Sequence, residues 1–336
     1  MFPTALAYFS LQRHIYPTPR SEAISCGITQ LSKTSATALV VVDASAQRKM
    51  GQAVLVLGPA GSGKSTFSDL VRQHVETMKR RVHVVNLDPA AEHFAYPVAA
   101  DIRELISLED VMEEMNLGPN GALIYCMEFL VENIDWLQDE LEQIGPDEYV
   151  LFDCPGQIEL YSHVPAMVTL TQELQRMGYR VAAAYLLDSA FAADVAKFVS
   201  GVLCCLSAMT MLELPHINVL SKCDLLPSKA GLDAFLDGDA GGLAERLDGR
   251  TKPRFHRLNK AICELIDEWS MVQFLPLDPT DSDTVDLVLA QLDTMLQYHD
   301  DVEPKEMMEG DDEDDADHDG FFGLGSCDND GGGGSG

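Results

Sequence analysis

The chain has 336 residues, of which 46% are hydrophobic, so it can bury a sizeable core and wholesale disorder is excluded. Its 23 basic and 54 acidic side chains give a net charge of −31, which argues against direct binding of nucleic acid through the phosphates. The eight cysteines include no CxxC pair, which argues against a zinc ribbon or a disulfide scaffold.

The two ends of the chain differ from the part between them. Residues 1–49 are rich in Ser, Thr and Ala, and we expect a disordered extension that is either a targeting segment or gene-model sequence upstream of Met50. Residues 300–336 hold fourteen acidic side chains and one lysine and end in glycines, so we expect an acidic, Gly-rich, disordered tail. The folded domain is expected over residues 51–299.

Six short runs of apolar residues predict the strands of this domain. They span residues 54–57, 82–87, 149–152, 181–187, 217–220 and 272–275. The runs are mostly apolar and do not alternate regularly, which is typical of strands covered on both faces, and helical stretches separate them. Because alternating strands and helices favour parallel crossovers, we predict a three-layer α/β fold with a mostly parallel sheet of five or six strands.

Three further segments carry expectations about the fold. Residues 198–214 are apolar but include two serines, a threonine and a glutamate, so we expect a buried helix and not a membrane span. Residues 231–251 are rich in Gly and Asp, and we expect a mobile insertion there. An apolar stripe predicts that the last helix covers residues 282–299.

Residues 58–66, GPAGSGKST, match the P-loop pattern between a predicted strand and a predicted helix. Glycines let successive backbone N–H groups surround phosphate oxygens at the positive end of the helix. Lys64 supplies a charge to the β- and γ-phosphates, and Ser65 offers its hydroxyl to Mg²⁺. The nucleotide-binding residues predicted here are Gly61, Ser62, Gly63, Lys64, Ser65 and Thr66.

Two motifs that follow predicted strands indicate the chemistry at the phosphates. In the sequence DCPGQ, Asp153 can reach the metal through water, the Gly156 N–H can meet a γ-phosphate, and Gln157 can orient water. Asp88, in the sequence NLDPA, faces the same edge of the sheet. We expect the attacking water to lie between Gln157 and Asp88; the alternatives give Asp88 to the metal or make it a helix N-cap.

The tetrapeptide Ser221-Lys222-Cys223-Asp224 follows another strand and is a variant of the guanine-reading motif [NT]KxD. The Asp224 carboxylate can accept both guanine N–H donors, while the stem of Lys222 covers the base. The first position normally braces the loop, and here it is Ser221. Adenine lacks the donors that Asp224 would need, so the motif favours GTP once a P-loop precedes it.

The sequence around residue 120 resembles the GPN-loop GTPases. Gly118-Pro119-Asn120 alone would pass as a β-turn, but it is followed by residues 125–129, YCMEF, and it accompanies the four motifs above. The resemblance covers about residues 50–300 and implies a P-loop GTPase of the signal-recognition and MinD-like class. It also implies that Asn120 contacts the phosphate of a second subunit in trans.

The same resemblance implies partners and a cellular role. Members of the family form dimers, so the expected partner is another GPN-loop subunit in a heterodimer, with a homodimer as the alternative. The implied role is assembly and nuclear import of RNA polymerase II, with its subunits as further partners, in the cytoplasm with shuttling to the nucleus. We expect neither direct nucleic-acid binding nor a membrane. Relatives in the wider class carry an extra P-loop lysine where Pro59 and Ala60 stand here, which favours slow turnover.

Two other functions remain open from the sequence. A small-molecule or nucleoside kinase would need an acceptor pocket and an arginine-bearing lid, and it would leave Asp224 unexplained. A scaffold that binds nucleotide without turnover would not need Lys64, Ser65, Asp153 and Gln157 intact. Release of phosphate from GTP without an acceptor separates the GTPase from both.

Overall fold

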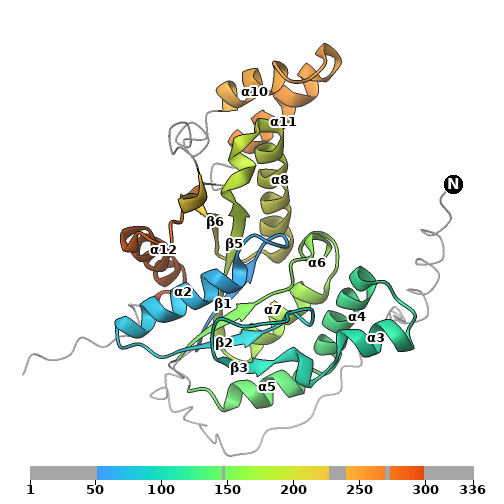
Figure 1. Cartoon of the computed structure of the whole chain (residues 1–336), viewed down its shortest axis with the longest axis vertical. Helices are drawn as coiled ribbons and strands as arrows, with labels where there is room; N and C mark the ends of the chain where they lie inside the picture. The colour runs from blue at the N-terminus through green and yellow to red at the C-terminus, as the bar shows by residue number, and fades with distance from the viewer. Residues whose placement is uncertain (1–50, 146–147, 227–239, 269–272, 299–336) are drawn as a thin grey trace, which may run out of the picture. The chain divides into compact units, whose positions relative to one another are not determined.

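The structure is a computed structural model that describes residues 51–145, 148–226, 240–268 and 273–298; the expectations for residues 1–49 and 300–336 lie outside this part. Seven strands form one sheet in the order β3-β2-β4-β1-β5-β6-β7, and every neighbouring pair is parallel (Figure 1). The strands are β1 (Gly51–Leu57), β2 (Val82–Asn86), β3 (Val98–Asp101), β4 (Tyr149–Asp153), β5 (Tyr179–Asp188), β6 (His216–Ser221) and β7 (Phe274–Pro276).

Helices cover both faces of the sheet, as the three-layer prediction requires. The longer ones are α2 (Lys64–Thr77), α3 (Leu108–Glu114), α4 (Pro119–Glu132), α5 (Ile134–Glu142), α6 (Ile158–Ser162), α7 (Ala166–Arg176), α8 (Val195–Leu212), α10 (Ala240–Asp248), α11 (His256–Glu268) and α12 (Ser282–Met295). Along β1, Val54 and Val56 pack with α2 and α12, whereas Ala53, Leu55 and Leu57 pack with α4, α5, α7 and α8. The alternating side chains of a fully buried strand thus serve two cores.

All six predicted strands are present, and the prediction of an α/β fold with a parallel sheet is confirmed. The expected strand count was wrong, because β3 forms the edge of the sheet with four residues, of which only Ala100 is buried. A short, half-exposed edge strand lacks the apolar run that marks the others. A mobile insertion was expected over residues 231–251, but residues 240–248 form helix α10, so that part of the prediction was wrong. Residues 231–239 lie outside the described part. The last helix ends at Met295, earlier than expected.

Helix α8 is the element that the sequence predicted as a buried helix. Within the described part of the chain, it is the one helix long and apolar enough to cross a membrane, by length and composition alone. Half of this 18-residue stretch is buried in the fold. Phe198, Val202 and Cys205 pack into the core against the sheet, which is how a core helix of a globular protein behaves.

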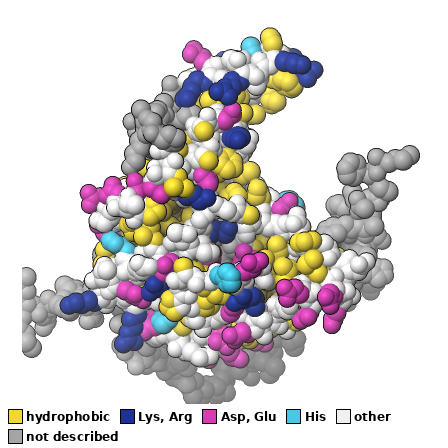
Figure 2. Space-filling view, viewed as in Figure 1, with side chains coloured by type: hydrophobic (Ala, Val, Ile, Leu, Met, Phe, Trp, Pro, Cys, Tyr) yellow, Lys and Arg dark blue, Asp and Glu magenta, His cyan; other side chains and the backbone are white. Residues whose placement is uncertain are grey.

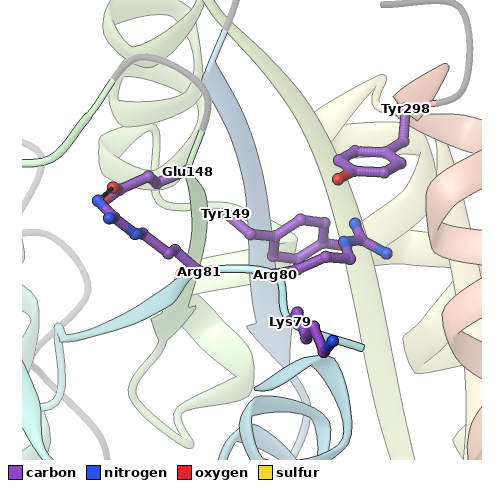
Figure 3. A pocket seen from close by; sticks show the side chains of 6 residues that line it. All are labelled: Lys79, Arg80, Arg81, Glu148, Tyr149 and Tyr298. Carbon is purple, nitrogen blue, oxygen red and sulfur yellow. Dashed lines mark hydrogen bonds and ion pairs between the residues drawn. The ribbon is translucent and has the colours of Figure 1, made fainter. Parts of the chain in front are cut away.

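A cavity of about 350 Å³ lies at the amino ends of β2 and β4, lined by Lys79, Arg80, Arg81, Glu148, Tyr149 and Tyr298 (Figure 3). The Arg80 guanidinium lies 3.6 Å from the centroid of the Tyr298 ring and pairs with Asp293 at 2.7 Å. Arg81 pairs with Glu148 at 2.9 Å. The Arg80–Asp293 pair joins α12 to the segment that precedes β2. It lies at the amino ends of the strands, opposite the end of the sheet where β4 reaches Asp153.

Candidate nucleotide and magnesium site

The P-loop connects β1 to α2 and adopts a backbone that glycine alone accepts easily. Gly58, Gly61 and Gly63 have φ values of 138°, 76° and 87°. A Cβ at Gly58 would lie 2.3 Å from the carbonyl oxygen of Leu186, so the loop passes directly over β5. Helix α2 begins at Lys64, so its unpaired N–H groups and its positive dipole end face the space that the loop encloses.

Lys64 is buried at the base of this loop. Its Nζ donates hydrogen bonds to the carbonyl oxygens of Gly58 and Pro59, each at 3.2 Å. Burial lowers the pKa of Lys64, and the negative charges of Asp153 and Asp88 offset this effect in part. The structure thus brings together one cation and two carboxylates that the sequence predicted from three separate motifs.

Asp153 ends β4 and is 2% exposed. Its Oδ2 accepts a hydrogen bond of 2.6 Å from the Tyr96 hydroxyl, whereas its Oδ1 is buried and has no hydrogen-bond partner among the described residues. Burial raises the pKa of the carboxyl group, and the hydroxyls of Tyr96 and Ser65 and the charge of Lys64 act in the opposite direction.

This arrangement fits Mg²⁺. A buried carboxylate oxygen without a partner, with the exposed Ser65 hydroxyl beside the carboxyl group, offers the hard oxygen ligands that the ion prefers. Among the residues that the structure describes, no group of three or more His, Cys, Asp or Glu side chains could hold a metal. Mg²⁺ usually takes several of its ligands from phosphate and water, so it needs few side chains of the protein.

Gly156 lies against the P-loop. A Cβ there would lie 2.7 Å from Ala60 Cα, 2.9 Å from Ala60 N and 3.0 Å from Lys64 Nζ, so a larger residue would displace the loop. The next residue, Gln157, is the N-cap of α6, and its Oε1 is buried without a hydrogen-bond partner in the described part of the chain. The structure therefore brings Gly156 against the P-loop beside Lys64 and leaves the Gln157 side-chain oxygen available for a hydrogen bond.

Asp88 follows β2 and is held by a network of hydrogen bonds. Its Oδ1 accepts from the Ala90 N–H at 2.9 Å, and its own N–H donates to Asn86 Oδ1 at 3.1 Å. Asn86 Nδ2 in turn donates to Asp101 Oδ1 at 2.8 Å. Burial raises the pKa of Asp88, while the Ala90 N–H and Lys64 lower it. The carboxylate is thus held beside the P-loop lysine by residues of β2 and β3.

The predicted base-reading loop is tied to the P-loop. Ser221 Oγ donates to the Ser62 carbonyl at 2.7 Å, and Lys222 Nζ donates to the Gly61 carbonyl at 2.5 Å and pairs with Asp188 at 2.7 Å. Cys223 is buried behind the loop, and Asp224 is exposed beyond it. The serine therefore braces the two loops against each other, as expected for the first position of the motif.

Asn120 lies apart from these contacts. It is exposed, and within the described part of the chain it makes no hydrogen bond to the P-loop. Gly118-Pro119-Asn120, which alone would pass as a β-turn, forms the start of helix α4, with Gly118 as N-cap and Pro119 as its first residue. Proline suits that position because its fixed φ is helical and the missing N–H has no partner there anyway.

Two side chains of the site were missed by the sequence interpretation. Tyr96 donates a hydrogen bond to Asp153, but the sequence interpretation assigned it no role, because no local pattern shows which distant side chain a tyrosine will contact. Asp188, which pairs with Lys222, is the last residue of β5. Its position at a strand end is a signal that could have identified it, because carboxyl ends of parallel strands carry ligand-binding residues.

Comparison with known proteins agrees with this geometry. The model of a family described as a conserved hypothetical ATP-binding protein matches residues 56–298. The chain is 52% identical over 261 residues to a protein named GPN-loop GTPase 3 from Dictyostelium discoideum, covering 76% of this chain and 91% of that protein. It is 50% identical over 277 residues to GPN-loop GTPase 3 from Danio rerio, covering 80% and 96%.

A solved structure shows a similar fold. The crystal structure of an apo-form GTPase from Pyrococcus abyssi superimposes with a TM-score of 0.61 and covers 73% of this chain and 97% of its own. At 24% sequence identity, this likeness supports the α/β fold and the parallel sheet alone.

Proposed function

The chain belongs to the GPN-loop GTPases, and on that premise we propose that it binds GTP with Mg²⁺ and hydrolyses its β–γ phosphoanhydride as a slow, dimeric switch. The observation that carries the proposal is the direct connection between the phosphate-binding loop and the base-reading loop. Ser221 donates to Ser62 at 2.7 Å and Lys222 donates to Gly61 at 2.5 Å. One bound nucleotide can therefore contact both loops at once.

The choice between GTP and ATP depends on Asp224. The family model is described as ATP-binding, whereas the similar proteins are named GTPases. Asp224 presents an exposed carboxylate just beyond the loop that Ser221 braces. A carboxylate accepts hydrogen bonds and cannot donate, so it complements the two N–H groups of guanine and finds no such pair on adenine. We therefore assign GTP as the substrate.

Nucleotide titrations test this assignment. Asp224→Asn should weaken GTP binding by at least about tenfold and strengthen binding of xanthosine triphosphate, because the amide can donate to the added oxygen. Asp135→Asn, an equivalent change on the exposed face of α5, is the matched control and should bind GTP like the wild type. Wild-type affinity for ATP equal to that for GTP would contradict the assignment.

Hydrolysis would depend on positioning and charge. When bound, Mg²⁺ on Ser65 and, through water, on Asp153 would neutralise charge on the phosphates. Lys64 supplies a further charge, and Gln157 Oε1, which has no partner among the described residues, can accept a hydrogen bond from the attacking water. Proton removal by Asp88 would be inefficient at neutral pH, so positioning carries most of the rate.

Asp88→Asn separates its two assignments. If Asp88 positions the water, GTP affinity with Mg²⁺ should stay near the wild-type value while the single-turnover rate falls strongly. If Asp88 serves the metal, Mg²⁺-dependent binding should weaken and recover partly at high Mg²⁺. The hydrogen bond from Ala90 to its Oδ1 holds the carboxylate rigidly beside Lys64, which supports positioning. An unchanged single-turnover rate would reject both assignments.

The similar proteins are named GTPases, which favours GTP hydrolysis over the kinase and the scaffold that the sequence left open. A kinase would need an arginine-bearing lid, and basic side chains do gather over the α10–α11 end of the molecule (Figure 2). Arg250, however, pairs with Asp194 at the start of α8 at 2.7 Å, which ties it to the fold. Release of phosphate from GTP by the purified chain, with no acceptor present, would exclude both alternatives.

We further propose that Asn120 acts in trans across a dimer. Its exposure at the start of α4, on a proline-stiffened first turn, supports presentation to a second subunit. Mixing Asn120→Ala and Lys64→Ala chains, each inactive alone, creates one site with an intact P-loop and an intact asparagine. Partial recovery of GTP hydrolysis is the expected result. Mixed dimers as inactive as either parent would refute the role in trans.

The cellular role proposed from the family resemblance is assembly and nuclear import of RNA polymerase II, with shuttling between cytoplasm and nucleus. The partner would be another GPN-loop subunit in a heterodimer, with a homodimer as the alternative. The net charge of −31 supports action on proteins and not directly on nucleic acid. Affinity purification of the tagged chain should recover GPN-loop and polymerase subunits; recovery of neither would contradict this role.

A further inference from the structure

The hydrogen bond from Tyr96 makes the two carboxylate oxygens of Asp153 different from each other. Oδ2 accepts the Tyr96 hydroxyl at 2.6 Å, and Oδ1 has no partner in the described part of the chain. Both side chains are buried, with exposed fractions of 4% and 2%. The Tyr96 hydroxyl therefore restricts the orientation of the buried carboxylate, and in this orientation Oδ1 is left available beside Ser65.

We propose that Tyr96 is a positioning residue that holds Asp153 with Oδ1 facing the magnesium position beside Ser65. The proposal rests on the proposed GTPase function and adds to it a residue that touches neither nucleotide nor metal. Outer partners of this kind fix the orientation of metal-directed carboxylates, and their loss commonly weakens metal binding by about 10- to 100-fold.

Tyr96 is itself held by the segment between β2 and β3. The rings of Phe94 and Tyr96 lie 5.5 Å apart, and the Arg103 guanidinium lies 4.6 Å from the Phe94 ring. Arg103 also donates to the Ala91 carbonyl at 2.8 Å and pairs with Asp101 at 2.6 Å. The tyrosine ring packs in the core between the sheet and α2, so its hydroxyl approaches Asp153 from a rigid support.

The same segment begins at Asp88. Asn86 binds both the Asp88 backbone and the Asp101 side chain, and the latter pairs with Arg103. Two carboxylates of the site, Asp88 and Asp153, are therefore oriented by one stretch of chain from β2 to β3. A change in that stretch would alter the metal-directed and the water-directed side chains together.

Tyr96→Phe tests the proposal because it removes the hydroxyl and keeps the ring in the core. The matched control is Tyr149→Phe. Tyr149 begins β4, the strand that Asp153 ends, and its buried hydroxyl has no hydrogen-bond partner among the described residues. The readout is the Mg²⁺ concentration needed for half-maximal binding of a non-hydrolysable GTP analogue, with Mn²⁺ binding by electron paramagnetic resonance as a second measure. Tyr96→Phe should raise that concentration by about 10- to 100-fold, and Tyr149→Phe should not.

Two further measurements separate positioning from general damage. Nucleotide affinity in EDTA and the melting temperature of Tyr96→Phe should stay close to those of Tyr149→Phe. In the Asp153→Ala background, Tyr96→Phe should cause no further loss of Mg²⁺ dependence, because the tyrosine acts through the carboxylate. Equal Mg²⁺ dependence in wild type and Tyr96→Phe, or an additive loss in the double variant, would overturn the inference. Absence of Mg²⁺-dependent nucleotide binding in the wild type would instead refute the proposed function.

Discussion

A buried histidine far from any motif should make the protein sensitive to mild acid. His216 begins β6, is 9% exposed, and stacks on the Tyr185 ring with centroids 6.2 Å apart. Both of its ring nitrogens are buried and have no hydrogen-bond partner among the described residues. Protonation would therefore place an unpaired charge in the core. Burial accordingly lowers the pKa of His216 from 6.5 to about 4.

The magnitude follows from the linkage between proton binding and folding. Between pH 6.5 and about 4 the unfolded chain binds a proton at this histidine and the folded chain does not, so stability falls as the pH falls. One pKa unit corresponds to about 1.4 kcal/mol. His216 should therefore remove about 2 kcal/mol of the unfolding free energy at pH 5, and roughly 3 kcal/mol at pH 4, relative to pH 7.

Replacement of His216 by phenylalanine measures this contribution, because the ring stack with Tyr185 is kept and the titrating group is lost. Urea unfolding at pH 7, 6 and 5 gives the stability of both proteins, and the carboxylates common to both cancel in the difference. The variant should gain about 2 kcal/mol on the wild type between pH 7 and pH 5. His93→Gln, at an exposed position, should show no such gain. A stability difference that is independent of pH would refute the reasoning.

Three further substitutions test the nucleotide site. Gly156→Ala should weaken GTP binding by about 10- to 100-fold in calorimetric titrations, because its Cβ would lie 2.7 Å from Ala60 Cα, whereas Gly249→Ala, with no contact closer than 3.7 Å, should not. Ser221→Ala should weaken GTP binding by about tenfold in the same assay, since the Ser62 carbonyl loses its donor. Asp153→Asn should raise the melting temperature of the nucleotide-free protein at pH 7. Burial raises the pKa of Asp153, so the gain should shrink as the pH falls towards 3.8, where the unfolded carboxyl also binds a proton.

The sequence was sufficient to predict the sheet and the motifs at its carboxyl edge. The central strands are continuous apolar runs because both of their faces are buried, and that pattern depends on no distant partner. The P-loop, Asp153 and the Ser221–Asp224 motif each follow such a strand. Since parallel strands end at one edge of a sheet, the sequence alone predicts that these motifs lie close together.

The features that escaped prediction depend on contacts between distant residues. Strand β3 exists because its backbone pairs with β2, although its side chains are mostly exposed. The hydrogen bond from Tyr96 to Asp153 joins residues 57 positions apart, and no local pattern marks it. At Asn120 the residues were recognised but their conformation was not, because a Gly-Pro pair is compatible with a turn as well as with a helix start.

The charged groups of the site explain why the free protein should gain stability from its ligand. For Lys64, Asp88 and Asp153, burial is the largest influence on the pKa, and in each case it opposes the charged form. The opposite charges of the lysine and the carboxylates offset this effect only in part, since the three pKa values stay shifted in the direction that burial sets. A nucleotide phosphate beside Lys64 and a cation beside Asp153 would supply the missing partners. Binding would thereby offset the free-energy cost of burying groups that catalysis requires to be charged. Because the ligand binds the folded state, it would also raise the stability of that state.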